Sequence, residues 1–221
     1  MIVLDGVSKR FRTGGTSKTV FEGLDLQLPT DARLGILGGA QSGKSTLAHL
    51  LAGLEEPSSG RIHRYAEVSF PIGYSRALRP NMSGRENVQH AARLYGADPA
   101  EVLDLVARTT DIGPMLEEPL RRFPHADRAM LAHALGYALP FDTYLIDEFV
   151  AVGPPRFRER CFKMLDARCQ ESGLILVTMY PRKVREHCDR VGVIAQGKLT
   201  LFDRLQEGID YFERLEVVGA S

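Results

Sequence analysis

The stretch RLGILGGAQSGKSTLAHLL, residues 33–51, decides the fold of this chain. Its first part, RLGILG, is an apolar run typical of a buried strand, and a glycine-rich segment follows it. In the last part, Leu47, Leu50 and Leu51 recur at the spacing that places them on one face of a helix. A strand, a glycine-rich loop and a helix in this order predict the phosphate-binding unit of an α/β protein. A glycine-rich turn before an ordinary helix is the alternative.

The glycine-rich segment fits the phosphate-loop pattern of Gly, any four residues, Gly, Lys, and Ser or Thr. Glycines let successive backbone amides close round phosphate groups, and the helix N-terminus adds a favourable dipole. We expect Lys44 to reach the terminal phosphates of the ligand and Ser45 to supply a ligand to Mg²⁺. The candidate nucleotide-binding residues of the loop are Gly38, Gly39, Ala40, Gln41, Ser42, Gly43, Lys44, Ser45 and Thr46.

Two acids end a second apolar run, TYLID, residues 143–147. Ligands of parallel sheets bind at the carboxyl ends of the strands, so these acids are expected near the phosphate loop. There, Asp147 can hold the magnesium shell, and Glu148 can orient and deprotonate a water that attacks the terminal phosphate. Without a phosphate loop, two acids at a strand end indicate only that the chain returns to solvent.

Further apolar runs predict the rest of the sheet. LILVT (residues 174–178) and VGVIA (residues 191–195) are short runs of strand type, and a turn at residues 196–198 leads into LTLF. Such runs alternate with helical stretches, which is the pattern of an α/β protein with a mostly parallel sheet. MIVLDGVSKRF and FEGLDLQL predict two strands of an antiparallel side sheet, with a loop rich in Gly, Thr and Ser between them.

Helical patterns fill the segment between residues 83 and 139. ENVQHAARLYG, EVLDLVART and ADRAMLAHALGYAL all favour helix, so we expect a helical insertion that interrupts the sheet. After Pro155, four side chains recur at the spacing of one buried stripe on a further helix: Phe157, Cys161, Met164 and Leu165.

Composition excludes several classes of protein. The chain has 221 residues, 44% of them apolar, which suits one domain with a real core rather than a disordered tail. Its 28 basic and 28 acidic side chains give no net charge, so we expect no nucleic-acid partner. No apolar run approaches the roughly 20 residues that cross a bilayer, and no signal-peptide pattern opens the sequence, so any membrane link is expected to come through a partner. Three cysteines fit no paired metal spacing, which is typical of a reduced cytosolic chain.

The motifs and their flanking segments carry a family resemblance that covers nearly the whole chain. The segments that carry it are LGILGGAQSGKSTLAHLLAGLEEPSSGRI, NMSGRENVQHAARLYGAD, EEPLRRF, FDTYLIDEFVAVG, RFRERCF, REHCDRVGVIAQGKL and the DYFERL tail. In this order they resemble the ATP-binding subunits of ABC transporters, and more narrowly those that export capsular polysaccharide across the bacterial inner membrane. The resemblance implies a single ABC ATP-binding domain over residues 1–221. It divides into a nucleotide-binding core of residues 1–82 and 138–221 and a helical subdomain of residues 83–137.

The resemblance also implies a function. Such subunits bind and hydrolyse ATP with Mg²⁺, and they drive a separate integral membrane permease that moves capsular polysaccharide or a related glycolipid. They work as face-to-face dimers, which here means a homodimer or a heterodimer with a more competent paralogue. They lie peripherally on the cytoplasmic face of the bacterial inner membrane. The segment ENVQHAARLYG is the candidate docking surface for the permease.

Three site residues follow from matching positions. Asp147 matches the magnesium-associated acid of the family, and Glu148 matches the catalytic base. Phe11 matches the aromatic residue that stacks on adenine, and its alternative is a core phenylalanine of the side sheet. A soluble small-molecule kinase with the same loop would explain neither the helical insertion nor the turn at residues 196–198.

Four positions depart from the family, and all four serve hydrolysis. Tyr74 stands where a Gln senses magnesium and the attacking water, and Pro154 stands where an Asp links the two sites across the dimer. FPHAD, residues 123–127, replaces the signature loop, whose Ser and Gly residues cap a helix against the partner subunit's ATP. Met179 replaces the His that contacts the terminal phosphate, and a thioether can neither donate a hydrogen bond nor carry a proton.

These departures predict ATP binding with slow turnover, because loss of the group at residue 179 alone can lower the rate ~10²-fold. The alternative function is a degenerate, weakly hydrolysing scaffold or regulatory subunit of the same kind of complex. His125, when protonated, is one candidate to replace the lost phosphate donors, although the carboxylate of Asp127 nearby would repel phosphate. A solvated loop histidine is the alternative.

Overall fold

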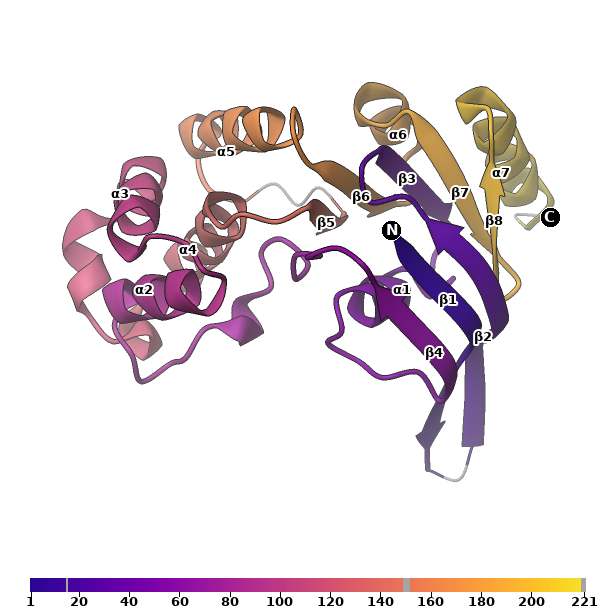
Figure 1. Cartoon of the computed structure of the whole chain (residues 1–221), viewed down its shortest axis with the longest axis horizontal. Helices are drawn as coiled ribbons and strands as arrows, with labels where there is room; N and C mark the ends of the chain where they lie inside the picture. The colour runs from indigo at the N-terminus through magenta and orange to yellow at the C-terminus, as the bar shows by residue number, and fades with distance from the viewer. Residues whose placement is uncertain (15, 149–151, 220–221) are drawn as a thin grey trace. The chain divides into compact units, whose positions relative to one another are not determined.

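The computed structural model describes residues 1–14, 16–148 and 152–219, which form two compact units (Figure 1). The first unit draws on residues 1–71, 142–149 and 171–221, and the second on residues 72–141 and 150–170. The first unit contains both sheets, and the second contains the helices of the middle of the chain. None of the helices in the described part of the chain is both long enough and apolar enough to cross a membrane.

A five-stranded sheet forms the centre of the first unit. Its strand order is β5-β6-β3-β7-β8, in which β5, β6, β3 and β7 run parallel and β8 runs antiparallel to β7. The strands are β3 (Arg33–Gly38), β5 (Thr143–Asp147), β6 (Gly173–Thr178), β7 (Arg190–Ala195) and β8 (Lys198–Phe202). The mostly parallel sheet is therefore confirmed, and the last three strands begin one residue earlier than predicted. Strands buried on both faces have near-continuous apolar sequences, which is why the sequence predicts them.

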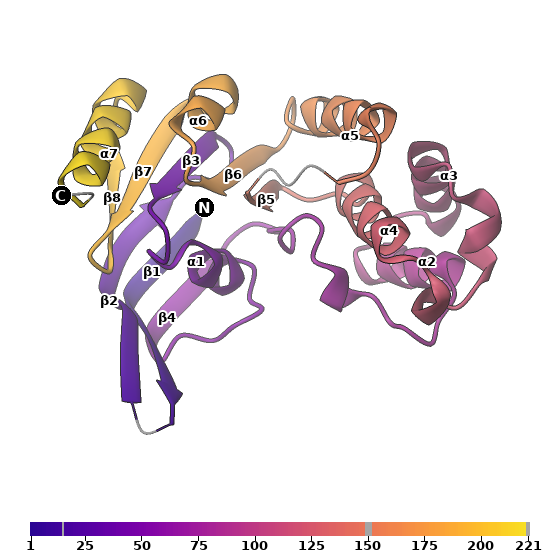
Figure 2. The same cartoon turned by 180° about the vertical axis from the view of Figure 1, so that it is seen from behind.

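Helices cover both faces of this sheet (Figure 2). Helix α1 (Lys44–Leu51) packs on one face, and α6 (Pro181–His187) and α7 (Leu205–Gly219) pack on the other. The three leucines predicted to share one face of α1 are each 0% exposed, so that prediction is confirmed. Gly35 of β3 permits the close approach of α6, because a Cβ there would lie 2.5 Å from Cγ1 of Val184.

The second sheet of this unit is antiparallel, as predicted, with the strand order β2-β1-β4. Its strands are β1 (Ile2–Thr13), β2 (Thr16–Leu28) and β4 (Ser59–Arg64). The predicted loop between the first two strands is wrong, because both strands continue to a tight connection in which Thr13 pairs with Thr16. Cross-strand pairing of side chains such as Phe11 and Lys18 extends the ladder into the polar segment. The inner face of this sheet shares one hydrophobic core with α1 and the five-stranded sheet.

The second unit is helical. Its helices are α2 (Gly84–Leu94), α3 (Pro99–Thr110), α4 (His125–Ala138) and α5 (Pro155–Arg168), and single 3₁₀ turns cover Ser75–Ala77, Gly113–Glu117 and Leu120–Arg122. Ser83 and Glu86 form a capping box at the start of α2, and Asp98 caps α3 through the N–H groups of Ala100 and Glu101. The three helices predicted between residues 83 and 139 are thus confirmed.

Helix α5 belongs to this unit because its apolar stripe packs against α3 and α4. Phe157, Cys161 and Leu165 of the predicted stripe are buried, and Met164 is half-buried. Arg168 adds hydrogen bonds from its guanidinium to the carbonyls of Tyr137 (3.3 Å) and Ala138 (2.6 Å) at the end of α4. The unit therefore extends beyond residues 83–137, which lie inside it, to residues 72–141 and 150–170.

Candidate functional site

The glycine-rich loop connects the central strand β3 to α1. The loop follows β3 and therefore begins at the carboxyl edge of the sheet. In the strand order β3 lies between β6 and β7, where the connections between strands change direction, and ligands of such sheets bind at this point. Two residues of the loop have left-handed backbone, Gln41 at φ 58° and Gly43 at φ 100°. A Cβ on Gly43 would lie 2.5 Å from Cγ1 of Val20, so only glycine lets the loop pack this closely on β2.

Hydrogen-bond donors gather at this loop. The Lys44 ammonium donates to the carbonyls of Gly38 (2.9 Å) and Gly39 (2.8 Å), which folds its side chain back along the loop. The hydroxyl of Ser42 is buried, and among the described residues it has no hydrogen-bond partner. Helix α1 starts without a side-chain cap and without an acid in its first turn. An orphaned buried hydroxyl, an uncapped helix N-terminus and a lysine together fit a polyanion such as the phosphates of a nucleotide.

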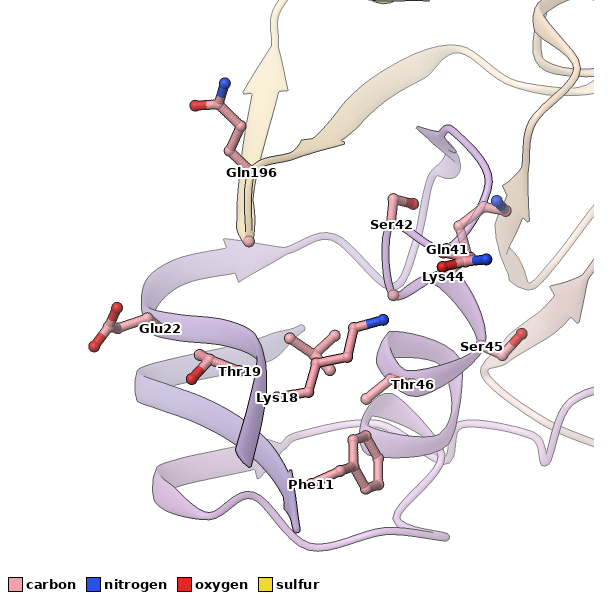
Figure 3. Close-up of a pocket in the computed structure, with 13 residues that line it drawn as sticks. Phe11, Lys18, Thr19, Glu22, Gln41, Ser42, Lys44, Ser45, Thr46 and Gln196 are labelled. Carbon is pink, nitrogen blue, oxygen red and sulfur yellow. The ribbon is translucent and has the colours of Figure 1, made fainter. Parts of the chain in front are cut away.

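The loop borders an open pocket of about 750 Å³. Figure 3 shows Phe11 and Lys18 projecting toward the loop and α1, while the side chain of Glu22 points away. The pocket is lined by Phe11, Lys18, Thr19, Val20, Glu22, Gln41, Ser42, Gly43, Lys44, Ser45, Thr46, Gln196 and Gly197.

Phe11 presents an aromatic face to this pocket. It is 39% exposed, so it is not a core phenylalanine of the side sheet. Lys18 is its cross-strand partner on β2, so both side chains project from the same face of the sheet. The ammonium of Lys9 lies 5.0 Å from the centre of the Phe11 ring. An aromatic ring and a lysine beside a phosphate loop suit a ligand that joins a flat base to phosphates.

The two acids of the second motif lie at the same edge of the sheet. Asp147 is half-buried at the carboxyl end of β5 and pairs with Val177 of β6. Since β6 separates β5 from β3, Asp147 lies two strand spacings, about 10 Å, from the axis of β3. Ser45, at the start of α1, and Asp147 offer oxygen donors, the type that Mg²⁺ prefers in sites that it completes with water and phosphate oxygens.

Glu148 follows Asp147 with a left-handed backbone, φ 63°. Both oxygens of its carboxylate accept hydrogen bonds from the residues that end β6. The hydroxyl of Thr178 donates to Oε2 at 2.6 Å, and the backbone N–H of Met179 donates to Oε1 at 3.0 Å. The N–H of Glu148 in turn donates to the carbonyl of Val177 at 2.9 Å. The orientation of the Glu148 carboxylate is therefore set by β6 and the residue after it.

Three neighbours of the site were not predicted from the sequence. Lys18 lies in the segment that the sequence predicts to be a loop. Beyond its place at a strand end, Thr178 has no sequence feature that indicates a functional role. Glu216 of α7 places Oε1 only 2.5 Å from the position that a Cβ on Gly39 would occupy, so a carboxylate lies directly beside the phosphate loop. Nothing in the local sequence indicates that contact, because it depends on how α7 packs on the sheet.

The positions at which the sequence predicts departures from the family have these places in the fold. Met179 is 38% exposed at the end of β6, in the first unit. The other three lie in the second unit: Tyr74 precedes the turn at Ser75–Ala77, Pro154 precedes α5, and residues 123–127 lead into α4. The helix predicted after the altered signature loop is confirmed. Residues 149–151, part of the matched segment after Glu148, lie outside the described residues.

The first turn of α4 carries both ionisable side chains of the altered segment. His125 begins the helix and is exposed, and Asp127 follows two residues later. Pro124 precedes the helix and supplies no side-chain cap, whereas Phe123 is only 4% exposed and packs inside the unit. Residues 123–127 therefore form a folded helix start with a buried phenylalanine.

The chain matches known proteins over most of its length. Residues 21–150 match the family model described as ABC transporter. The chain is 33% identical to the ATP-binding protein BexA of Haemophilus influenzae, over 98% of its own length and 100% of that protein. It is also 33% identical to the capsule polysaccharide export ATP-binding protein CtrD of Neisseria meningitidis serogroup B, over 97% of its own length and 100% of that protein.

Solved structures share the fold at lower identity. An ATP-binding subunit of an ABC transporter matches with a TM-score of 0.75 and 19% identity, over 97% of this chain and 98% of that chain. The dimeric ATP-binding cassette MJ0796 bound to ADP and Pi matches with a TM-score of 0.71 and 16% identity, over 93% of this chain and 99% of that chain. At these identities the likeness is one of fold.

Proposed function

This chain belongs to the ABC transporter family, among the ATP-binding proteins of capsule polysaccharide export, and from that premise we propose that it powers such an exporter. It binds ATP in the pocket beside the phosphate loop and couples hydrolysis to a separate integral membrane permease. The cargo is capsular polysaccharide or a related glycolipid. The chain lies peripherally on the cytoplasmic face of the bacterial inner membrane.

The observation that carries the proposal is the cup formed by the loop and the start of α1. Its orphaned Ser42 hydroxyl, uncapped helix N-terminus and Lys44 ammonium supply donors without a competing acid in the first turn of the helix. Phe11 adds an aromatic face in the same pocket. These groups match the two parts of ATP, a triphosphate and a flat base.

Each site residue has a part in hydrolysis. Lys44 leaves its loop carbonyls and binds the terminal phosphates, and Phe11 stacks on adenine. Ser45 and Asp147 would hold Mg²⁺, which neutralises charge on the phosphate oxygens when bound. Glu148 accepts a proton from a water whose oxygen forms the new bond to the γ-phosphorus, while the bond to the bridging oxygen breaks and ADP leaves.

Two partners follow from this function. A second ATP-binding subunit, either another copy of this chain or a more competent paralogue, completes the dimer. The permease docks on the second unit, for which residues 86–96 are the candidate surface. Leu94 supports this choice, because it lies at the end of α2 and is 70% exposed.

The degenerate scaffold remains a second candidate, and α4 favours it. In place of signature-loop donors, this helix follows Pro124, which has no N–H, and carries Asp127 in its first turn. A homodimer would then bind ATP and close weakly, so the complex would hold nucleotide with little turnover.

Steady-state ATPase activity of the chain purified with its permease tests the proposal. Wild type is compared with Glu148→Gln, and polysaccharide export is measured in cells that carry each version. We expect Glu148→Gln to lower the ATPase rate at least ~10²-fold and to abolish export. Equal ATPase rates, with export intact in both versions, would contradict the role of a transport ATPase and support that of a scaffold.

A further inference from the structure

The carboxylate of Glu148 is held at both oxygens by one short segment, residues 178–179. Thr178 ends the buried strand β6 and is itself 0% exposed. Its hydroxyl donates to Oε2 at 2.6 Å, while the Met179 N–H donates to Oε1 at 3.0 Å. Two donors from a rigid strand end therefore fix both the position and the plane of the carboxylate.

A third group also forms a hydrogen bond with the Thr178 hydroxyl. The N–H of Tyr180 donates to Thr178 Oγ1 at 3.2 Å. A hydroxyl has one hydrogen and two lone pairs, and a carboxylate oxygen accepts, so the hydrogen points to Glu148 while a lone pair accepts from Tyr180. The Thr178 hydroxyl thus accepts from Tyr180 and donates to Glu148.

The second donor does not depend on the side chain at residue 179. The Met179 side chain is 38% exposed, and the hydrogen bond to Glu148 comes from the backbone N–H of this residue. Met179 can therefore occupy this position without loss of the contacts that orient the carboxylate. Glu148 also keeps a left-handed backbone, φ 63°, which non-glycine residues disfavour, so contacts from its surroundings must hold this backbone in place.

We propose that Thr178 is a positioning residue for Glu148, and that it preserves hydrolysis in a site whose residue 179 has no side-chain donor. This inference rests on the proposed function, in which Glu148 accepts a proton from the attacking water. In this role Thr178 acts on the reaction through Glu148, so its loss affects the chemical step and leaves ATP binding unchanged.

Thr178→Val and Thr178→Ser test this in the purified complex with its permease. Valine keeps the shape and removes the hydroxyl, whereas serine keeps the hydroxyl. Thr143→Val is the matched control, because Thr143 is also 0% exposed in the same sheet and donates its hydroxyl to a carbonyl, that of Thr30, at 2.7 Å. Thr178→Ala replaces the valine variant if that one is not recovered folded.

We expect kcat to fall about 10- to 100-fold in Thr178→Val with KM for ATP within about twofold of wild type, because a hydrogen bond to a charged group is lost. Serine restores kcat to within about threefold, and Thr143→Val leaves it within about twofold. Adding Thr178→Val to Glu148→Gln lowers the rate no further, since both changes remove the same function.

The outcomes test the positioning role of Thr178 separately from the proposed function. Equal kcat in Thr178→Val and Thr143→Val, or equal losses in the valine and serine variants, would overturn the positioning role even if Glu148→Gln is inactive. A Glu148→Gln variant as active as wild type would instead overturn the proposed function. A rise in KM that accounts for the whole loss in Thr178→Val would make Thr178 a binding residue and contradict the inference.

Discussion

Glu216 should weaken ATP binding, and its neutralisation should strengthen it. The carboxylate lies beside Gly39, within the loop that receives the phosphates. Two unit charges 4 Å apart in water interact by about 1 kcal/mol, and a triphosphate brings more than one charge. We therefore expect Glu216→Gln to lower the Kd for ATP about five- to tenfold in titration calorimetry at low salt.

The control for this prediction lies one turn earlier on the same helix. Glu213 is also exposed, but it pairs with Arg185 at 3.1 Å. Glu213→Gln removes the same charge and should change the Kd by less than about twofold. The gain in Glu216→Gln should shrink as salt is raised to about 0.5 M, because exposed charges are then screened. An unchanged Kd in Glu216→Gln at low salt, or an equal gain in both variants, would refute the reasoning.

Three further predictions concern the pocket and the second unit. Phe11→Ala should weaken ATP binding about 5- to 100-fold in calorimetry, while binding of inorganic triphosphate stays unchanged, because only the base loses its stacking partner. Gly43→Ala should lower the free energy of unfolding in urea by at least about 1 kcal/mol, because the residue has φ 100° and its new methyl group would collide with Val20; an unchanged unfolding midpoint would contradict this. Burial lowers the pKa of His133 below its ordinary 6.5, so the unfolded chain binds more protons and stability should fall as pH drops below about 6.5. In His133→Gln the loss of unfolding free energy between about pH 7.5 and about pH 5 should be smaller than in wild type; an equal loss would exclude His133 as its source.

The local part of the site could be predicted from the sequence. The phosphate loop is a continuous segment in which each residue has a local role, and the buried strands β3 and β5 place it and Asp147 at one edge by topology alone. Strands that are apolar on both faces and helices with one apolar stripe could be recognised for the same reason: their periodicity is local.

Contacts between distant segments could not be predicted in this way. Strand β4 has only Ile62 even partly buried, so it lacks the alternation that identifies a strand. Phe11 reaches the pocket only because the β1–β2 ladder continues through a polar segment. The donors to Glu148 lie 30 and 31 residues further along the chain, and they meet it because β5 pairs with β6. Each of these is decided by tertiary pairing rather than by local pattern.

Titration calorimetry of Mg²⁺ and ATP against the folded wild-type chain and Lys44→Ala tests the central claim most directly. Lys44 is held at the loop by two carbonyls, so its loss removes a charged donor from the phosphates. We predict saturable heat with one ATP per chain for wild type and at least ~100-fold weaker binding for Lys44→Ala. Absence of binding to the wild-type chain, or equal affinity in the two proteins, would contradict the account.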